Sequence, residues 1–434
     1  MQYLQLFLRG ISANWKRLLV YLFFNGIIVL FTPNCLGETL QQIIMELILL
    51  TVSILLLLCY SALLIYYRKS WLSIPNFKAA AHSDFYTKIS IIIPARNEEE
   101  NIANCLQSII DQSYPKHLFE VLVVDDHSSD NTAAIIAGYG AQNVKLISLK
   151  DFIAANEINA YKKKAIEIAI QQSSGELIVT TDADCIFPTH WLTTIAAFYE
   201  TKKPAFIVMP VLIRHSNRMI EIFQSLDFMT LQGITGASVH KKFHSMCNGA
   251  NLAYTKEAFT AVNGFKGIDN IASGDDMLLL HKIYKRFPNK ICYLKSQDVI
   301  VETNPLTTLH QFLNQRIRWA SKADQFDDKR IFVVLIIVYF LNVLLLALPI
   351  VALVNQQEIP LFHCQLPMIQ WYYILLISKT LIELFFLYPV ATFFNQTKLI
   401  GWFPIAQPFH ILYTVIAGWL GKFGKYTWKE RSVK

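Results

Sequence analysis

Charged residues are scarce in this chain, and no charge of either sign dominates it. Asp, Glu, Lys and Arg make up 16% of the 434 residues, whereas hydrophobic residues make up 53%. So apolar a composition favours a protein with membrane segments over a soluble enzyme of the same length. The net charge is only +7. Basic residues that flank membrane spans on the cytoplasmic side explain it better than an anionic partner does, and nothing indicates a nucleic acid.

Familiar metal- and nucleotide-binding patterns are also missing. The seven cysteines stand apart, with no Cys-X-X-Cys and no histidine at zinc spacing, so they predict small apolar residues of a reducing compartment. The chain has no Gly-X-Gly-X-X-Gly after its first strand and no Gly-X-X-X-X-Gly-Lys-Ser/Thr. Dinucleotide-binding and P-loop folds therefore lose most of their support. A nucleotide could still bind through carboxylates to its base and ribose and through a metal to its phosphates.

Two apolar runs near the N-terminus predict membrane segments. Residues 18–32 form a short run that ends at Pro33. A short membrane helix is favoured over a signal-peptide core, because no small-X-small cleavage site follows clearly. Residues 47–67 form an unbroken run that is long enough to cross a bilayer. Lys and Arg are absent between the runs and present on their outer sides, so the positive-inside rule places the N-terminus and everything after residue 68 in the cytoplasm.

Further apolar runs lie toward the C-terminus. Two clear spans are predicted, over 331–354 and 371–394. The second contains Lys379 and Glu383, and charges are costly inside a membrane. We expect this pair to face protein or water, and mutual neutralisation is favoured over a role in a substrate path. The last run, 400–420, is interrupted by two prolines and followed by five basic residues, so the sequence leaves open whether it spans the membrane, re-enters it or lies at its surface.

Between these regions, short apolar strands alternate with helical periods. Strands are expected at 89–94, 121–124, 144–149 and 177–181, and helices at 98–110, 132–137 and 162–171. Continuous Val-, Ile- and Leu-rich strands separated by helices are typical of a parallel sheet that is covered on both faces. Ligands of such sheets bind beyond the carboxyl ends of the strands.

Three of the expected strands end in polar clusters at that edge. The clusters are Pro94-Ala-Arg96-Asn97-Glu98, Asp125-Asp126 and Asp182-Ala-Asp184. Two carboxylates one residue apart, here Asp182 and Asp184, offer hard oxygen ligands to Mg²⁺ or Mn²⁺, which can also hold a diphosphate. An isolated Asp-X-Asp turn is a weak signal, but three polar strand ends in one sheet strengthen it.

The region after the strands contributes another acidic pair. A turn-rich polar cluster, Cys247–Asn251, is expected to precede a helix. Gly274-Asp275-Asp276 is expected to open the helix Met277–Tyr284. One aspartate then caps that helix, which is worth ~1 kcal/mol, and leaves the other available as a general base.

An amphipathic helix is expected just before the third membrane run. It covers residues 306–322 and carries Gln315-Arg-Ile-Arg318-Trp319, so we expect it to lie at the bilayer surface. Arg and Trp at such a surface are often only anchors, and the pentapeptide alone does not separate anchoring from catalysis.

With these residues laid out, the chain resembles the membrane-bound family-2 glycosyltransferases, which include the cellulose, chitin, hyaluronan and poly-N-acetylglucosamine synthases. The resemblance covers about residues 85–325 and extends to the flanking membrane segments. Four motifs match in order: Pro94-Ala-Arg-Asn97-Glu98, Asp125-Asp126, Asp182-Ala-Asp184 and Gln315-X-X-Arg318-Trp319. The family's catalytic motif, commonly Thr-Glu-Asp or Gly-Asp-Asp, appears as Gly274-Asp275-Asp276. The resemblance implies an α/β fold: a GT-A-type nucleotide-sugar-binding domain with a mostly parallel central sheet, flanked by transmembrane helices.

The resemblance also implies roles at the donor end of the site. Residues implied in holding the nucleotide-sugar are Pro94, Arg96, Asn97, Glu98, Asp126, Lys162 and Asp182. Among them, Asp126 would meet a uracil edge and Asp182 the ribose. Lys162 takes the place of the lysine in the family's Gly-Lys-X-X-Ala-Leu, near the phosphates, although Tyr161 replaces the glycine. Asp184, with Asp182 beside it, would ligate Mg²⁺ or Mn²⁺.

At the acceptor end, Asp276 is the implied base, which leaves Asp275 as the helix cap. Arg318 would steady the diphosphate, and Trp319 would stack under the acceptor sugar. Gln315, in the same motif, is the remaining residue that the resemblance implies at the catalytic site. A metal and Arg318 can neutralise the charge of the leaving nucleoside diphosphate, and a carboxylate can take the proton of the attacking hydroxyl. One base and no second carboxylate nucleophile favour inversion at the anomeric carbon.

The sequence therefore predicts a membrane-embedded enzyme that transfers a sugar from a UDP-sugar to a growing polysaccharide or a lipid-linked acceptor. Its catalytic domain is expected on the cytoplasmic side of the inner membrane, in contact with membrane lipids. Two alternatives stay open: single transfer to a membrane lipid, and a non-catalytic nucleotide-sugar-binding subunit of an export complex. The complete set of catalytic carboxylates argues against the second. The expected regions are 1–70 and 331–420 in the membrane, 85–305 for the catalytic domain and 306–325 for the surface helix.

Overall fold

The computed structural model of the chain describes residues 38–79, 85–153, 159–243, 246–271, 274–322, 328–355, 358–361, 364–423, 426–428 and 431–433. The short membrane helix expected at 18–32 lies outside these residues. The chain divides into two compact units, one made of residues 1–60 and 340–379 and the other of residues 61–339 and 380–434. Every predicted site residue belongs to the second unit.

The described part of the first unit consists of apolar helical segments and a hairpin. Parts of three helices belong to it: α3 (Glu38–Ser73), α12 (Lys329–Asn355) and α13 (Met368–Phe393). The hairpin pairs β10 (Glu358–Leu361) antiparallel with β11 (Cys364–Pro367). Inside this unit the indole N–H of Trp371 donates to the Ser53 hydroxyl at 3.0 Å. Many of its Leu and Ile side chains stay exposed, as lipid-facing side chains would.

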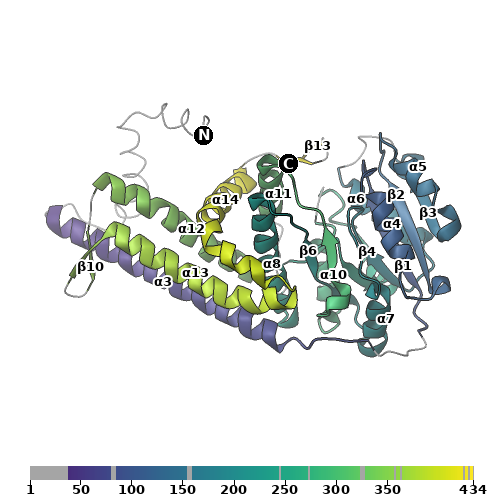
Figure 1. The fold of residues 1–434 in the computed structure, drawn as a ribbon, viewed down its shortest axis with the longest axis horizontal. Helices are drawn as coiled ribbons and strands as arrows, with labels where there is room; N and C mark the ends of the chain where they lie inside the picture. Colours follow the sequence, from purple (N-terminus) through teal and green to yellow (C-terminus); the bar gives the residue numbers. More distant parts are fainter. Residues whose placement is uncertain are drawn as a thin grey trace. The chain divides into compact units, whose positions relative to one another are not determined.

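The second unit is built on a seven-stranded sheet of order β3-β2-β1-β4-β7-β5-β8 (Figure 1). Its strands are β1 (Ile89–Ala95), β2 (Phe119–Asp125), β3 (Val144–Ser148), β4 (Leu177–Thr180), β5 (Phe206–Val208), β7 (Leu252–Thr255) and β8 (Ile291–Tyr293). Neighbouring strands are parallel except β7, which runs antiparallel to β4 and β5. The mostly parallel sheet expected from the Val- and Ile-rich runs is confirmed.

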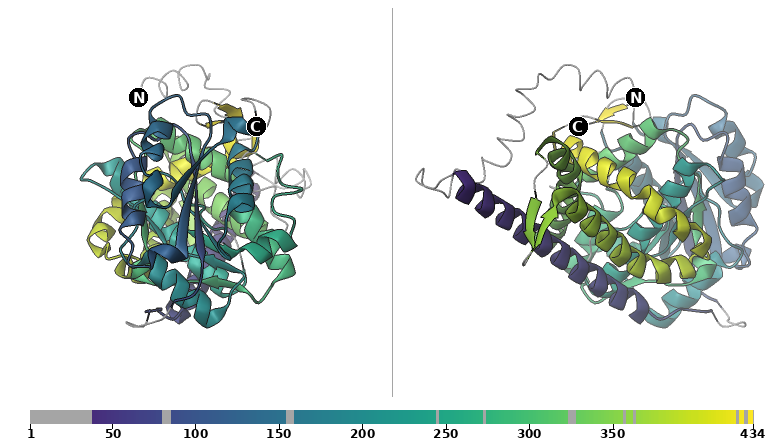
Figure 2. Two further views of the ribbon diagram at one scale, coloured as in Figure 1. Left: turned by 90° about the vertical axis from the view of Figure 1, so that its right-hand side faces the viewer. Right: turned by 60° about the vertical axis from the view of Figure 1, so that its left-hand side comes forward.

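Helices cover this sheet on both sides (Figure 2, left). Helix α6 (Tyr161–Gln172) contacts β1 and β2, and α5 (Thr132–Ala137) contacts β3 and β2. The other α-helices of the unit are α4 (Ile102–Ile110), α7 (Trp191–Lys202), α8 (Met219–His240), α9 (Lys256–Ala261), α10 (Met277–Arg286), α11 (Leu309–Ala320) and α14 (Phe403–Phe423). Because both faces are covered, the side chains of β1 from Ile91 to Ile93 are fully buried, which explains why its sequence reads as an apolar run.

Short elements complete the unit. A parallel pair joins β6 (Val211–Ile213) to β9 (Val301–Thr303), and an antiparallel pair joins β12 (Tyr426–Trp428) to β13 (Arg431–Val433). Single 3-10 turns are η1 (Lys116–Leu118), η2 (Gly140–Gln142), η3 (Leu149–Asp151) and η4 (Gln297–Val299), and a longer one is η6 (Thr397–Trp402).

Two element predictions were wrong in detail. The cluster Cys247–Asn251 leads into strand β7, and helix α9 begins only at Lys256. The strand forms there because its backbone groups pair with β4 on one side and with β5 on the other. The helix expected from Glu98 begins at Ile102, since residues 98–101 form turns at the end of β1.

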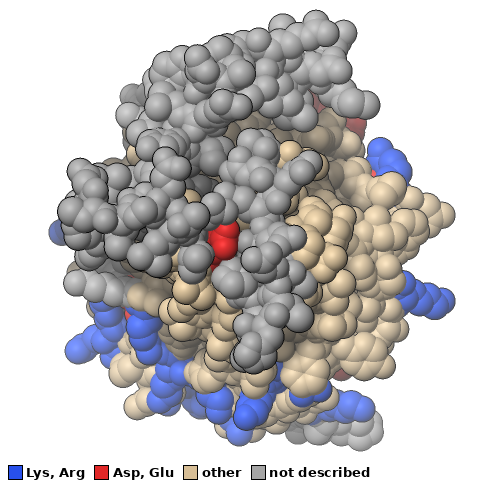
Figure 3. Space-filling view, turned by 90° about the vertical axis from the view of Figure 1, so that its left-hand side faces the viewer, with Lys and Arg blue, Asp and Glu red and all other residues tan. Residues whose placement is uncertain are grey.

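Four helical stretches of the described chain are long and apolar enough to cross a membrane: Ile44–Ser73, Arg330–Leu353, Met368–Phe393 and Thr397–Phe423. They coincide to within a few residues with the runs expected at 331–354 and 371–394, and they include those expected at 47–67 and 400–420. In Figure 3 most of the described residues on the face shown are neither basic nor acidic, and Lys and Arg lie along the lower edge and at the right of the view. Within the third stretch, Lys379 and Glu383 are buried, and Glu383 accepts a hydrogen bond from Gln407 of α14 at 2.6 Å.

Candidate active site

A cavity of about 270 Å³ lies beyond the carboxyl ends of β1, β2 and β4. It brings together every residue that we expected at the site except Asn97. These cavity-lining residues are Pro94, Arg96, Glu98, Asp126, Lys162, Asp182, Asp184, Asp275, Asp276, Gln315, Arg318 and Trp319. Side chains from positions more than 200 residues apart thus share one space, at the edge where a parallel sheet binds its ligands.

Asn97 has a different place, beside the cavity. Its backbone N–H donates to the Ser128 hydroxyl at 3.0 Å, and its side-chain oxygen accepts from the N–H of Ser129 at 2.9 Å. Asn97 also has a φ of 50°, in the left-handed region that Asn tolerates better than most residues. It therefore ties the loop after β1 to the loop after β2.

The loops after β1 and β2 form one end of the cavity. A guanidinium N–H of Arg96 donates to the backbone oxygen of Asp126 at 2.9 Å and lies 3.9 Å from its carboxylate. The ring of His127 contacts the same carboxylate at 3.1 Å. Asp126 is 5% exposed, so these partners hold a buried acceptor in a fixed position.

A lysine bridges the two acidic motifs. The Lys162 ammonium lies 2.7 Å from Asp182 and 3.2 Å from Asp275. Burial disfavours the charged form of Lys162, but Asp182 and Asp275 outweigh it and hold its pKa above the ordinary value. Burial alone would raise the pKa of Asp275, but Lys162 and Lys322 outweigh it and lower that pKa. Lys162 therefore stays cationic and Asp275 ionised.

The residues around Asp184 suit a divalent cation. Burial, with Asp182 and Glu98 nearby, raises the pKa of Asp184 to about 6. Three carboxylates that repel one another gain from a cation between them. Among the described residues no three Asp, Glu, His or Cys side chains form a full ligand set. A donor set as small as Asp184 with Asp182 fits a hard ion that keeps water and phosphate oxygens as ligands.

The structure corrects our assignment of the helix cap. Asp276, not Asp275, caps α10, because one of its carboxylate oxygens accepts from the N–H of Met277 at 2.7 Å. Its other oxygen accepts from the N–H of Gly249 at 3.1 Å. Burial and the neighbouring Asp275 raise the pKa of Asp276. Asp276 directly precedes the helix, whereas Asp275 is turned toward Lys162, and the sequence alone did not distinguish these orientations.

Helix α11 supplies the opposite wall of the cavity. It begins with a capping box in which the Thr308 hydroxyl and the Gln311 side chain each accept a hydrogen bond from the other residue's backbone N–H. Gln315, Arg318 and Trp319 line the cavity from this helix. The Trp319 ring lies 6.1 Å from the ring of Phe228, at an angle of 38°.

Comparisons with known proteins agree with this geometry. A family model described as glycosyl transferase family 2 matches residues 90–259, and one described as glycosyl transferase family group 2 matches residues 177–398. The second match covers more than half of the chain. The chain belongs to the family-2 glycosyltransferases.

Individual relatives match parts of this chain. The glycosyltransferase AglE of Haloferax volcanii is 36% identical over 104 residues, 24% of this chain and 33% of that protein. The poly-beta-1,6-N-acetyl-D-glucosamine synthase of Staphylococcus epidermidis is 24% identical over 246 residues, 54% of this chain and 53% of that one. The chain thus spans between about a third and a half of the length of these relatives.

A solved structure shares the fold of this chain. The mannosyltransferase PcManGT from Pyrobaculum calidifontis, in complex with GDP-Man and Mn²⁺, aligns with a TM-score of 0.51 and 20% identity. The alignment covers 84% of this chain and 99% of that one. The fold is therefore of the GT-A type, as expected.

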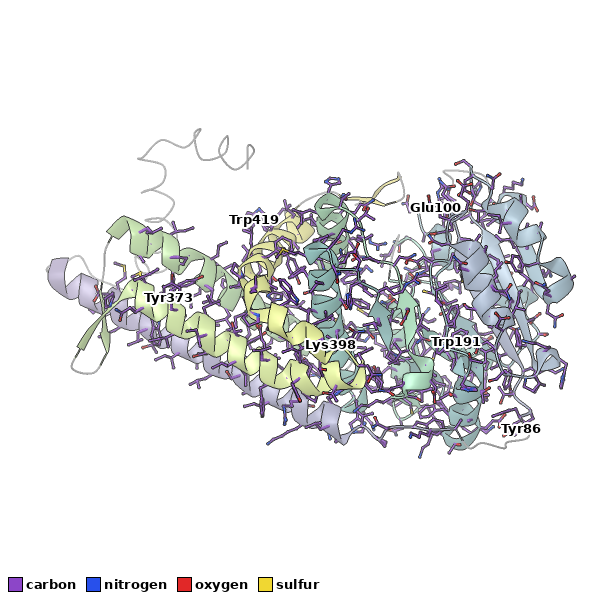
Figure 4. The ribbon with its side chains drawn as sticks, viewed as in Figure 1. Tyr86, Glu100, Trp191, Tyr373, Lys398 and Trp419 are labelled. Carbon is purple, nitrogen blue, oxygen red and sulfur yellow. The ribbon has the colours of Figure 1, made fainter. Side chains whose placement is uncertain are left out.

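Sequence reasoning missed several residues that line the cavity. They are Gln224, Phe228, Asn248, Gly249, Thr303, Asn304 and Lys322. Lys322 follows Arg318 by four residues, so helical spacing could have indicated it. The Thr303 hydroxyl donates to Asp184 at 2.9 Å, but it ends a three-residue strand that carries no pattern. The loop with Asn248 and Gly249 is held by Asn251, which accepts a hydrogen bond from the indole of Trp191 at 3.0 Å. Figure 4 labels Trp191, the first residue of α7.

Proposed function

We propose that the protein transfers a sugar from a UDP-sugar to a growing polysaccharide or a lipid-linked acceptor, with inversion at the anomeric carbon. The observation that carries this proposal is the single cavity in which Asp126, Lys162 and Asp184 meet Asp276 and Trp319. A donor can lie along the sheet edge while an acceptor approaches from α11. Some relatives are named for a polysaccharide product, such as the poly-beta-1,6-N-acetyl-D-glucosamine synthase of Staphylococcus epidermidis, and this supports a sugar polymer as the product.

Donor activation is assigned to the cationic groups. Lys162 is held ionised by Asp182 and Asp275, and Arg318 lines the same cavity. Both can stabilise the charge that develops on the departing diphosphate. A Mg²⁺ or Mn²⁺ ion held by Asp184 with Asp182 would supply Lewis-acid stabilisation of the same diphosphate. Asp126 and Arg96 would then receive the uracil and ribose end.

Proton removal is assigned to Asp276. Its raised pKa makes it a better proton acceptor than an ordinary aspartate at the same pH. The backbone N–H groups of Met277 and Gly249 fix its carboxylate, so no rotation is needed before the reaction. Asp275 is ion-paired with Lys162 at 3.2 Å, which leaves it poorly suited to attack the sugar. A base without a carboxylate nucleophile supports single displacement, with inversion.

We also propose a multi-pass inner-membrane protein with a cytoplasmic catalytic domain. Four apolar helices of spanning length support membrane insertion, and the basic residues after residue 67 support the orientation. Residues 1–70 and 331–420 then form the membrane regions, residues 85–305 the catalytic domain and residues 306–325 a helix at the membrane surface. Membrane lipids would contact this helix.

Transfer of one sugar to a membrane lipid is the second candidate. Ile213, Phe228 and Leu306 give the α11 side of the cavity an apolar lining, which suits the neck of a lipid as well as the face of a sugar. The name of one relative, the beta-monoglucosyldiacylglycerol synthase of Trichormus variabilis, points to the same class.

The test measures UDP release by purified protein with Mn²⁺, with and without membrane lipid. Radiolabelled UDP-glucose and UDP-N-acetylglucosamine supplied to membranes then identify the product. Labelled polymer supports the first candidate, and labelled lipid of fixed size supports the second. If UDP binds but is never released from either donor, the protein is a binding subunit and the proposed reaction is wrong.

A further inference from the structure

Arg316 stands between Gln315 and Trp319 in the sequence but does not line the cavity. Its side chain is buried, with 4% exposure. It lies where α11 meets α8 and α14, in a layer whose apolar part is formed by Phe223, Phe312, Ile317, Tyr413 and Ala417. A fully ionised side chain in such a layer requires fixed polar partners.

Asp227 of α8 is the first partner. Two N–H groups of the guanidinium donate to one carboxylate oxygen of Asp227, at 3.1 Å and 2.6 Å. The other oxygen accepts from the hydroxyl of Tyr413 on α14, and a ring nitrogen of His410 lies 3.9 Å away. Asp227 is itself 6% exposed. Short charge-assisted bonds in a buried layer leave the guanidinium little freedom to move.

The same guanidinium touches two residues of the cavity wall. Its third N–H group donates to the side-chain oxygen of Gln315 at 2.7 Å. Its central carbon lies 4.3 Å from the ring centre of Trp319 and 4.6 Å from that of Phe312. A guanidinium over an aromatic face attracts that face. The Trp319 indole is thereby in contact with Arg316, while the same residue lines the cavity.

We propose that Arg316 is a positioning residue, which fixes Gln315 and Trp319 at the acceptor end of the cavity. The inference rests on the proposed transfer reaction and adds a residue to it. Asp227 fixes Arg316, and Arg316 in turn orients an amide and an indole through contacts that need a planar fork of N–H groups. A lysine ammonium offers neither the fork nor the flat face.

A purely structural role makes a different prediction. The rings of Phe223, Phe312, Phe409 and Tyr413 already pack α8, α11 and α14 together, with centroids between 4.6 and 6.1 Å apart. If Arg316 only joined the helices, its loss would lower stability and act independently of Trp319. If it positions Trp319, its effect on turnover disappears when Trp319 is absent.

The experiment uses the full-length protein in detergent with lipid. The variants are Arg316→Lys, the pair Asp227→Asn with Arg316→Met, and each of these combined with Trp319→Leu. The paired variant removes both buried charges, so that no carboxylate is left without its counter-ion. UDP affinity is measured by calorimetry and turnover by UDP release from UDP-glucose and UDP-N-acetylglucosamine. Arg330→Lys is the matched control, because Arg330 also bonds an aspartate, Asp328 at 2.6 Å, but at the surface.

For Arg316→Lys and for the paired variant, we expect UDP affinity within about twofold of the wild type. Their turnover should be lower by about 10- to 100-fold, the loss that a small misplacement of a side chain at the reacting groups causes. No further loss is expected when Trp319→Leu is already present, and Arg330→Lys should match the wild type. Turnover of Arg316→Lys within twofold of the wild type overturns the inference. So does an equal loss with and without Trp319, or a loss of UDP affinity.

A readout without turnover separates this inference from the proposed function. Protein labelled with 5-fluorotryptophan gives one ¹⁹F resonance for Trp319, which Trp319→Phe identifies. Arg316→Lys should shift or broaden that resonance and leave the resonance of Trp191, which is buried on α7 and not bonded to Arg316, in place. An unmoved Trp319 resonance overturns the positioning role. A wild-type protein that releases no UDP overturns the proposed reaction, while the ¹⁹F result still decides whether Arg316 orients Trp319.

Discussion

The two neighbouring aspartates of Gly274-Asp275-Asp276 have separate surroundings, and the difference concerns single atoms. Asp275 faces the Lys162 ammonium at 3.2 Å, whereas Asp276 receives two backbone N–H groups. Burial raises the pKa of both carboxyls. Lys162 and Lys322 outweigh it at Asp275 and lower that pKa, whereas the neighbouring Asp275 raises the pKa of Asp276 further. Two similar side chains thereby become suited to two tasks.

Asp276→Asn tests this division. The amide keeps the shape but cannot take a proton, so transfer should fall by about 10²- to 10⁴-fold while UDP binds as before. Asp275→Asn should instead weaken UDP-sugar binding, because Lys162 loses a partner that holds it in place. Calorimetric titration with UDP and a UDP-release assay separate the two effects. Lost UDP affinity in Asp276→Asn would mean that the pair has been assigned in the wrong order.

Asp184→Asn tests the metal assignment. The change removes a charged oxygen and should lower turnover by about 100-fold or more, the cost of one group that stabilises charge in the transition state. EDTA should abolish the activity of the wild type, and Mn²⁺ or Mg²⁺ should restore it. Thr303→Val is a milder companion, since it removes only the hydroxyl that donates to Asp184 at 2.9 Å. Full activity of the wild type in EDTA contradicts a metal at this position.

Trp319 offers a test of acceptor stacking. Trp319→Phe keeps an aromatic face and should retain appreciable transfer, whereas Trp319→Leu should lose about tenfold or more with UDP binding intact. Arg318→Lys should reduce transfer independently, because an ammonium cannot make the two-pronged contact to phosphate oxygens. Product length and yield are the measurements. Unchanged product from Trp319→Leu would make the indole a membrane anchor only.

At the scale of elements, the sequence predicted the strands that have a continuous apolar pattern. It missed the elements that form only through contacts with residues distant in the sequence. Strands β1, β2 and β4 were expected within a few residues, because side chains buried on both faces must all be apolar. Strand β7 was not, since its four residues (Leu252–Thr255) carry no period of their own and form a strand only between β4 and β5. The cap at Asp276 was missed for a similar reason: a choice between adjacent aspartates depends on Lys162, which lies more than 100 positions away.

The crossing of α14 and α11 is another such contact. A Cβ atom on Gly421 would lie 2.6 Å from the Cβ of Ala320, and no flexible side chain is there to give way. Gly421→Ala should therefore cost about 1–3 kcal/mol and lower the melting temperature measured in detergent. Gly401→Ala is the control, because a Cβ there meets nothing within 4 Å. Equal melting temperatures for the two variants would show that the helices separate at this point.

For the whole molecule, the open question from the sequence was whether residues 400–420 cross the membrane. Helix α14 is long enough, but Phe409 and Tyr413 pack on α8 and α11 of the same second unit, and Gln407 bonds Glu383. Its other face exposes Ile405, Trp419 and Phe423 by 61%, 60% and 70%. A helix in the plane of the membrane surface requires one face packed on protein outside the bilayer and one apolar face, and α14 has both a packed face and an apolar face.

Cysteine labelling on intact cells tests that arrangement. In a background without the native cysteines, we expect Glu358→Cys, between α12 and α13, to react with an impermeant maleimide from outside. Lys398→Cys in η6 and Thr427→Cys in β12 should react only after the cells are permeabilised, because a helix that lies on the surface leaves both of its ends on one side. The basic residues after 420 favour the same side, since positive charge is retained in the cytoplasm. Thr427→Cys that reacts from outside while Lys398→Cys does not would show that α14 crosses the membrane.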